Sequence, residues 1–183
     1  MKYIQYTPDK DCNWKESLID CYKAVFAAPP WNEDWWTDIL VQEVLDQYAG
    51  QNACILVAIH EDSIIGFAFG AVWAKSELHT ELELVLPEIN SQNVAYVKDI
   101  GVSEPFRKKG VAETLLKKLI AVMTKSCASN DWIFARTLAR PKPSVVYKWF
   151  PSLGFRVVSE YPEENPRRGQ VILGCCLKSI TFK

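Results

Sequence analysis

Three cations, Arg107, Lys108 and Lys109, stand directly before Gly110, where an apolar pattern of helical spacing begins. A helix N-terminus already carries partial positive charge, so acidic residues are usual there. Three further cations would repel this positive end unless an anion lies in front of the helix. Such an anion also accepts hydrogen bonds from the first N–H groups of the helix. A glycine lets the chain turn tightly and lets the anion reach the backbone. The segment therefore predicts a phosphate-binding turn, with a solvated lysine-rich loop as the alternative.

Two widespread phosphate motifs are missing from the sequence. Neither GxxxxGK[ST] nor GxGxxG occurs, so the chain has no P-loop and no Rossmann fingerprint. The spacing is instead "RKKGVA", from Arg107 to Ala112, placed between a predicted strand and a predicted helix.

Hydrophobic periodicity predicts the elements that must position this turn. Helices are predicted at 12–27, 31–50, 109–126 and 142–150, with Asn32 as the N-cap of the second. Strands are predicted at 2–8, 53–59, 64–73, 93–102, 131–139, 154–161 and 170–180. Residues 75–92 form an acidic connector without a clear period. The predicted order is β-α-α-β-β-β-α-β-α-β-β.

This order and three motifs resemble the GCN5-related N-acetyltransferase (GNAT) superfamily over nearly the whole chain. "RKKGVA" is similar to the family's acyl-CoA-binding R-x-x-G-x-A pattern, "SIIGFAFG" to its central strand and "YKWFPSLGF" to its later Y-x-x-x-GF element. The resemblance implies one α/β domain over residues 1–183. Its sheet would be mixed, mostly antiparallel and twisted, with about seven strands, a splayed central strand pair and flanking helices.

The resemblance also implies acetyl-CoA as the co-substrate. Its pyrophosphate would lie at the glycine turn and its pantetheine arm along the preceding strand. The backbone N–H of Val102 or Gly101 would stabilise the oxyanion. The residues implied for acetyl-CoA binding are Ile100, Gly101, Val102, Arg107, Lys108, Lys109, Gly110, Val111 and Ala112.

Acetyl transfer to a primary amine needs a group that takes a proton from the amine. The resemblance implies a carboxylate on the strand that leads into the turn, and Asp99 occupies this strand. In the alternative interpretation Asp99 pairs with Lys98, Arg136 or a backbone amide and only shapes the site.

A proton donor for the departing thiolate is harder to assign. The family often has a tyrosine four residues before the glycine of its GF element, but Phe150 stands there. Tyr147 lies about one helical turn earlier and is the substitute donor, with simple packing as the alternative. The missing tyrosine motivates a second function: a non-catalytic acyl-CoA-binding or regulatory module of the same fold.

The acceptor is expected to be a small-molecule amine at the loop "FAAPPWNEDWW", where Trp31 and Glu33 supply an aromatic face and a negative charge. In the alternative, Trp31 anchors the loop to the core and Glu33 is a charge of the first helical turn.

Composition argues against nucleic-acid-binding, membrane and metal-binding proteins. The net charge of −1 over 183 residues gives no global basic field for nucleic acid or membrane. No apolar run approaches the ~20 residues of a membrane span, and we expect a cytoplasmic protein. Two histidines and no CxxC pair predict no metal site. The partners expected are acetyl-CoA and an amine, in a monomer or homodimer.

Overall fold

The computed structural model describes residues 1–8, 10–29, 31–50, 52–84, 86, 92–126 and 132–182. The strands are β1 (Lys2–Tyr6), β2 (Ala53–His60), β3 (Ser63–Ala74), β4 (Asn93–Val102), β5 (Trp132–Leu138), β6 (Arg156–Glu160) and β7 (Gln170–Cys176). The helices are α1 (Lys15–Ala27), α2 (Asp38–Tyr48), α3 (Lys75–Leu82), α4 (Val111–Ser126) and α5 (Val145–Trp149).

The strands follow one another in the order β1-β2-β3-β4-β5-β7-β6. The β4–β5 ladder is parallel and joins Ala95–Val97 to Ile133–Ala135. The ladders β1–β2, β2–β3, β5–β7 and β6–β7 are antiparallel. The predicted α/β class, with a mixed, mostly antiparallel seven-stranded sheet and flanking helices, is confirmed.

The chain divides into two compact units. The first contains Met1–Ala71 and Lys98–Ser126, and the second contains Val72–Val97 and Cys127–Lys183. Strands β3 and β4 therefore each give residues to both units.

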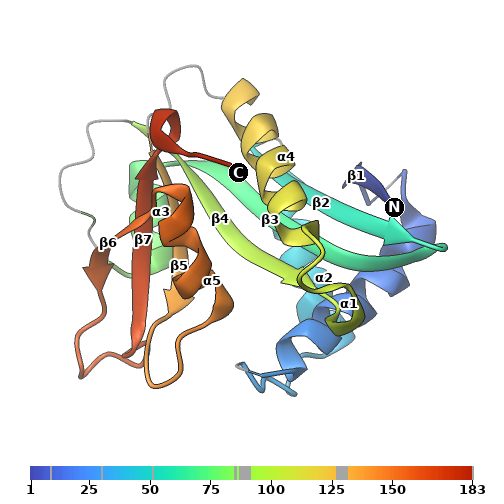
Figure 1. The fold of residues 1–183 in the computed structure, drawn as a ribbon, viewed down its shortest axis with the longest axis horizontal. Helices are drawn as coiled ribbons and strands as arrows, with labels where there is room; N and C mark the ends of the chain where they lie inside the picture. The colour runs from blue at the N-terminus through green and yellow to red at the C-terminus, as the bar shows by residue number, and fades with distance from the viewer. Residues whose placement is uncertain are drawn as a thin grey trace. The chain divides into compact units, whose positions relative to one another are not determined.

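In the first unit, helices cover both faces of the strands (Figure 1). Phe67 and Phe69 of β3 stack on Tyr22 of α1, with ring centroids 5.1 and 5.8 Å away. A Cβ placed on Gly66, directly before Phe67 in β3, would lie 3.3 Å from Leu115 of α4. Because successive strand residues face opposite sides, α1 and α4 pack on opposite faces.

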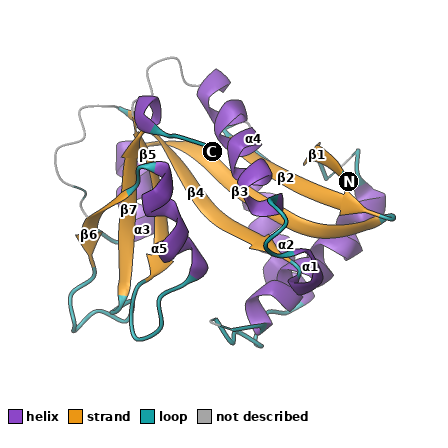
Figure 2. Ribbon diagram, in the orientation of Figure 1, coloured by secondary structure: helices purple, strands orange, loops and turns teal. Residues whose placement is uncertain are grey.

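In the second unit, α3 and α5 pack against the strands (Figure 2). Leu78 and Leu82 of α3 are fully buried in an apolar cluster that includes Phe134 of β5. The hydroxyls of Thr137, on the other face of β5, and Ser144, the N-cap of α5, are 2.6 Å apart. The Ser144 hydroxyl also accepts from the Tyr147 N–H at 3.0 Å, and this bond fixes the first turn of α5.

The prediction for the start of the second helix was wrong. Helix α2 begins at Asp38, and its N-cap is Thr37, whose hydroxyl accepts from the Leu40 N–H at 3.3 Å. Asn32 has a φ of 53°, a left-handed conformation unlike the extended backbone of an N-cap. Glu33 consequently lies in a loop and not in a helical turn.

A helix also replaces part of the predicted connector. Helix α3 buries Leu78 and Leu82, which are four residues apart and so share a helix face. The Glu77 carboxylate accepts from the Ala74 N–H at 2.8 Å and closes the first turn. Only two apolar residues in eight carry the helical period, and the surrounding polar residues conceal it.

Candidate active site

The connection from β4 to α4 forms a tight turn in the first unit. Lys108 and Gly110 have φ values of 61° and 76°, both in the left-handed region. Arg107 is half-buried, and its Nε donates to the Val102 carbonyl at 2.9 Å. The guanidinium therefore ties the turn to the end of β4 as well as adding charge.

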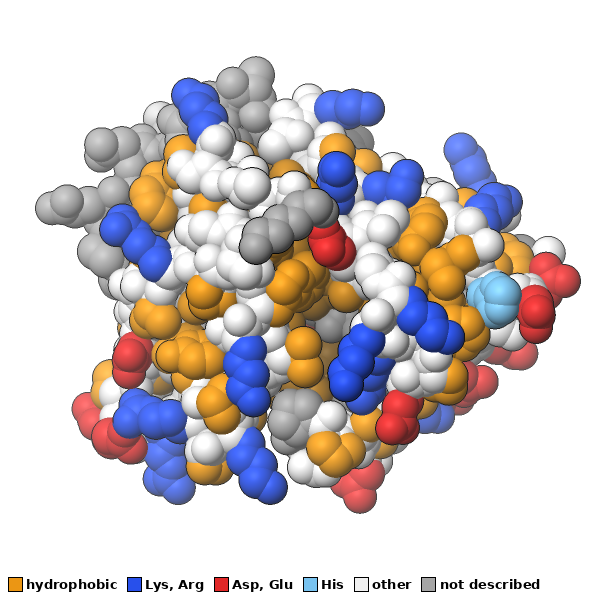
Figure 3. Space-filling model, in the orientation of Figure 1, with side chains coloured by type: hydrophobic (Ala, Val, Ile, Leu, Met, Phe, Trp, Pro, Cys, Tyr) orange, Lys and Arg blue, Asp and Glu red, His pale blue; other side chains and the backbone are white. Residues whose placement is uncertain are grey.

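The turn presents its cations to solvent in front of α4. Lys108 and Lys109 are exposed, and Lys and Arg side chains gather where the connection lies (Figure 3). A Cβ on Gly110 would meet nothing within 4 Å, so the glycine is required by its φ and leaves open space. The first main-chain bond after the turn runs from the Thr114 N–H to the Gly110 carbonyl at 3.0 Å. The N–H groups before Thr114 are the usual anion donors of a helix start.

The end of β4 is packed too tightly for any side chain at Gly101. A Cβ there would lie 2.6 Å from Cζ of Phe67 and 2.7 Å from Cγ1 of Val25. The backbone of Gly101 and Val102 is consequently held close to α1 and β3. Ile65 of β3 accepts from the Ser103 N–H at 2.9 Å and holds the chain as it leaves β4.

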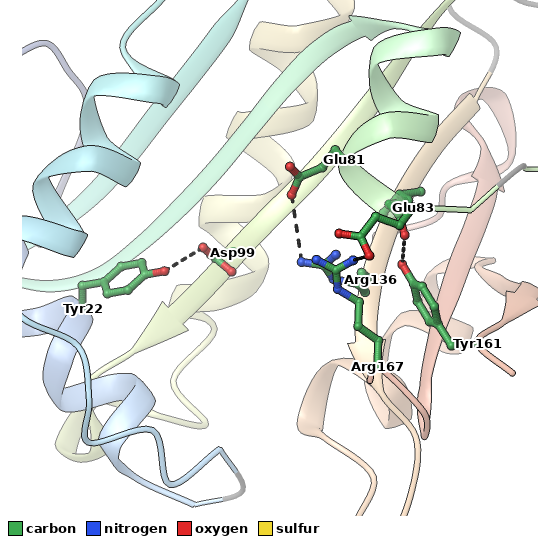
Figure 4. A network of polar contacts seen from close by, with 8 residues as sticks. Tyr22, Glu81, Glu83, Asp99, Arg136, Tyr161 and Arg167 are labelled. Carbon is green, nitrogen blue, oxygen red and sulfur yellow. Dashed lines mark hydrogen bonds and ion pairs between the residues drawn. The ribbon is translucent and has the colours of Figure 1, made fainter. Parts of the chain in front are cut away.

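Asp99, the predicted base, accepts a hydrogen bond from the Tyr22 hydroxyl at 3.0 Å (Figure 4). Tyr22 is almost fully buried, at 1% exposure, whereas Asp99 is half-buried. Burial and the Asp99 carboxylate both raise the pKa of the Tyr22 phenol above its ordinary range, so the hydroxyl keeps its proton. Sequence reasoning placed Tyr22 only on an apolar helix face, because nothing local identifies its partner.

Glu33 adds a second carboxylate near Asp99. It is half-buried and accepts from the Trp36 indole N–H at 2.8 Å. Burial raises the pKa of the Glu33 carboxyl, the bond from Trp36 opposes this rise, and the charge of Asp99 adds to it. Trp36 belongs to the aromatic loop of the predicted acceptor site, but its bond to Glu33 was not predicted, although the spacing of three is a weak local signal.

Aromatic rings surround this part of the first unit. Trp36 contacts Tyr22 edge to face at 5.0 Å between centroids, and Trp31 lies 5.9 Å from Phe26. Trp31 is half-buried, as the anchoring interpretation expects, and Trp35 is 55% exposed. Two carboxylates beside aromatic faces are suited to attract an ammonium group and to take a proton from it.

The predicted donor Tyr147 lies on α5 in the second unit and is half-buried. Phe150 is fully buried, and its ring packs on Phe155 at 4.6 Å between centroids. Helix α5 ends at Trp149 and continues as a 3₁₀ turn, Phe150–Leu153, that contains Pro151. Phe150 is therefore a core residue, and the role of Tyr147 stays a prediction.

Within the described part of the chain, no group of three or more His, Cys, Asp or Glu side chains is arranged to hold a metal. None of the described helices has both the length and the apolar character needed to cross a membrane.

Comparison with known proteins identifies a family. The family model described as "Acetyltransferase (GNAT) family" matches residues 13–138. No protein of curated function matches the sequence.

Several solved structures share the fold. Arabidopsis thaliana NAA60 in complex with acetyl-CoA is 15% identical, with a TM-score of 0.68 and coverage of 97% of this chain and 98% of that chain. Aminoglycoside 6'-acetyltransferase type Ii is 14% identical, with a TM-score of 0.67 and 100% coverage of both chains. PaiA N-acetyltransferase from Thermoplasma acidophilum, in complex with coenzyme A, is 13% identical, with a TM-score of 0.66 and coverage of 96% and 98%.

Proposed function

Because the chain belongs to the acetyltransferase (GNAT) family of N-acetyltransferases, we propose that it transfers the acetyl group of acetyl-CoA directly to the primary amine of a small molecule. The observation that carries this proposal is the Asp99 carboxylate, held by the buried Tyr22 hydroxyl at 3.0 Å. A carboxylate fixed in this way, with Glu33 in its electrostatic field, is suited to a cationic amine.

In the proposed reaction, Asp99 takes a proton from the ammonium group, directly or through water. The amine nitrogen then attacks the thioester carbonyl, a C–N bond forms, and the carbonyl oxygen gains negative charge. The backbone N–H of Gly101 or Val102 stabilises this oxyanion. The C–S bond breaks, and the CoA thiolate takes a proton from Tyr147 or from water. The nitrogen loses its second proton, which restores the Tyr147 hydroxyl or the water, and the neutral amide is released.

The glycine turn would bind the pyrophosphate of acetyl-CoA. The exposed Lys108 and Lys109 supply charge, and the first N–H groups of α4 supply directional donors. Arg107 holds the turn against β4 through the Val102 carbonyl. Titration calorimetry with acetyl-CoA tests this assignment: affinity that survives Arg107→Glu combined with Lys109→Glu would exclude the turn.

Thiol release with a panel of primary amines tests the transfer. We expect Asp99→Asn to lower kcat/KM by about 100-fold, the usual contribution of a general base. Asp34→Asn, which changes an exposed carboxylate in the same unit, should leave the rate unchanged. Acetyl-CoA binding without thiol release on any amine would favour the non-catalytic module.

The panel also tests the size of the acceptor. It pairs each small amine with a peptide that carries the same amino group. Higher kcat/KM on the peptides would overturn the small-molecule preference. We propose a cytoplasmic location and a monomer or homodimer, which cell fractionation and sedimentation velocity measure.

A further inference from the structure

Arg136 of β5 carries a buried guanidinium that the described residues satisfy only in part. Its side chain is 18% exposed, and its Nη1 is buried without a hydrogen-bond partner among the residues that the structure describes. Its Nη2 lies 3.9 Å from Oε1 of Glu81 on α3, which is beyond hydrogen-bond reach (Figure 4). A charged donor left unpaired in a protein interior destabilises the fold, so an arginine of this kind points to a ligand.

Arg136 is surrounded by apolar side chains and phenols, and its guanidinium is mostly shielded from solvent. Arg136 follows Phe134 on the α3 face of β5, at the border of the apolar cluster around Leu82. The phenols of Tyr96 and Tyr161 lie in its electrostatic field, and the Tyr161 hydroxyl accepts a hydrogen bond from the guanidinium, which leaves Nη1 as the nitrogen that lacks a partner among the described residues. Tyr161 is itself fixed, because its hydroxyl donates to the Leu82 carbonyl.

We propose that Arg136 is the anion-binding residue of a carboxylate site within the second unit. The planar guanidinium fork matches a carboxylate through two parallel N–H···O bonds, which supply the partner that Nη1 lacks. Glu81 at 3.9 Å lies close enough to repel a second negative charge. Glu83 is matched by its own cation, Arg167, at 2.8 Å. The local charge therefore favours a monoanionic carboxylate over a phosphate dianion.

The carboxylate has two possible sources: the acyl acceptor, or a separate small acid. The site itself does not depend on the proposed acetyl transfer, because binding is measured without acetyl-CoA or turnover. If the chain transfers no acetyl group, the propionate result still stands. If propionate does not bind, the proposed acetyl transfer is still untouched.

Nuclear magnetic resonance of the full chain with ¹⁵N-labelled arginine tests the site. Sodium propionate is titrated at constant ionic strength while the Nε–Hε resonance of Arg136 is followed. We expect a saturable shift with propionate and none with sodium chloride or propionamide. The absence of a saturable shift in the wild-type chain would overturn the proposal.

Variants separate binding from structure. Arg136→Lys keeps the charge but loses the fork, and we expect propionate affinity, followed on neighbouring resonances, to fall about tenfold. Arg140→Lys is the matched control, because exposed Arg140 pairs with Glu160 and Glu163 in the same unit at 3.4 and 3.5 Å. Glu81→Gln removes the competing carboxylate and should tighten propionate binding. Equal weakening by Arg136→Lys and Glu81→Gln would identify a structural ion pair and refute the site.

Paired acceptors then identify the source of the carboxylate. β-Alanine and β-alaninamide differ only in the carboxylate, so their KM ratio reports on Arg136. A KM that rises about tenfold in Arg136→Lys for the acid alone assigns the carboxylate to the acceptor. An unchanged ratio, together with a lost propionate shift, assigns it to a separate ligand.

Discussion

Tyr22 offers the smallest change that separates chemistry from packing in the first unit. Tyr22→Phe keeps the ring contacts with Phe67 and Phe69 and removes the hydroxyl that donates to Asp99. A hydrogen bond to a charged group contributes about 1.5–3 kcal/mol, so we expect kcat/KM to fall by roughly 10- to 150-fold, mainly through kcat. Steady-state thiol release measures the loss. Tyr6→Phe removes a hydroxyl from another buried tyrosine of this unit, and an equal loss there would refute the specific role of Tyr22.

Glu33 gives the first unit a predictable pH dependence. A carboxyl whose folded pKa is raised favours the folded state at low pH, and this contribution is lost as pH rises through the folded pKa. Glu33→Gln keeps an acceptor for the Trp36 indole but cannot ionise. We therefore expect the variant to gain stability relative to wild type between pH 4 and pH 7.

Urea unfolding at several pH values measures this difference for Glu33→Gln. Exposed Asp34 is the matched control, and Asp34→Asn should show no comparable gain. A gap between wild type and Glu33→Gln that stays constant with pH would contradict burial of the Glu33 charge.

At the residue scale, the sequence indicates residues that their neighbours in the chain identify. It misses residues whose partners are distant in the sequence. The sequence singles out Asp99 because it lies on the strand that runs into the glycine turn, and its role as the base stays a prediction. Its partner Tyr22 is 77 residues away, and Tyr also fits the apolar face of α1. Nη1 of Arg136, which has no hydrogen-bond partner in the described ranges, has no sequence signal, because its surroundings depend on how α3 and β5 pack.

At the scale of elements, β4 depends on one glycine. Gly101→Ala would place a Cβ 2.6 Å from Cζ of Phe67 and 2.7 Å from Cγ1 of Val25, so α1 or β3 must move. Overpacking of this kind costs about 1–3 kcal/mol, and we expect a loss of roughly 2 kcal/mol in urea unfolding. Gly50→Ala meets nothing within 4 Å and should change stability by less than about 0.5 kcal/mol.

Adding Phe67→Leu to Gly101→Ala removes the ring atoms that the new Cβ meets. The double variant should regain part of the loss, because the two changes are coupled through one contact. Additive losses would show that steric contact with Phe67 is not the cause.

Predictions of helices and strands succeeded where one sequence pattern, such as an apolar run or a polar turn, has no competing pattern. The apolar, β-branched run at 93–102 predicted β4 with the bounds that the structure has, and the turn at 60–63 predicted the β2–β3 hairpin. The prediction failed at α2, where "WNEDWW" resembles a capped helix start. Trp36 and Glu33 instead bond to each other in a loop, and Trp36 packs on Tyr22. Tertiary aromatic contacts outweigh local helix propensity there.

At the scale of the whole molecule, two strands run through both compact units. Strand β3 runs from the first unit into the second at Ala71 and Val72, and β4 runs back at Val97 and Lys98. Neither unit can unfold completely without breaking a strand that the other needs. We therefore expect one cooperative unfolding transition, in keeping with the prediction of a single domain over residues 1–183.

The tryptophans make this expectation measurable unit by unit. Trp14, Trp31, Trp35 and Trp36 report on the first unit, and Trp73, Trp132 and Trp149 report on the second. In chains labelled with 5-fluorotryptophan, the ¹⁹F resonances of both groups should disappear at one urea concentration, which matches the midpoint seen by far-ultraviolet circular dichroism. Two separate midpoints, one for each group, would contradict the single domain. They would also mean that the ladders within each unit hold more stability than the strands shared between the units.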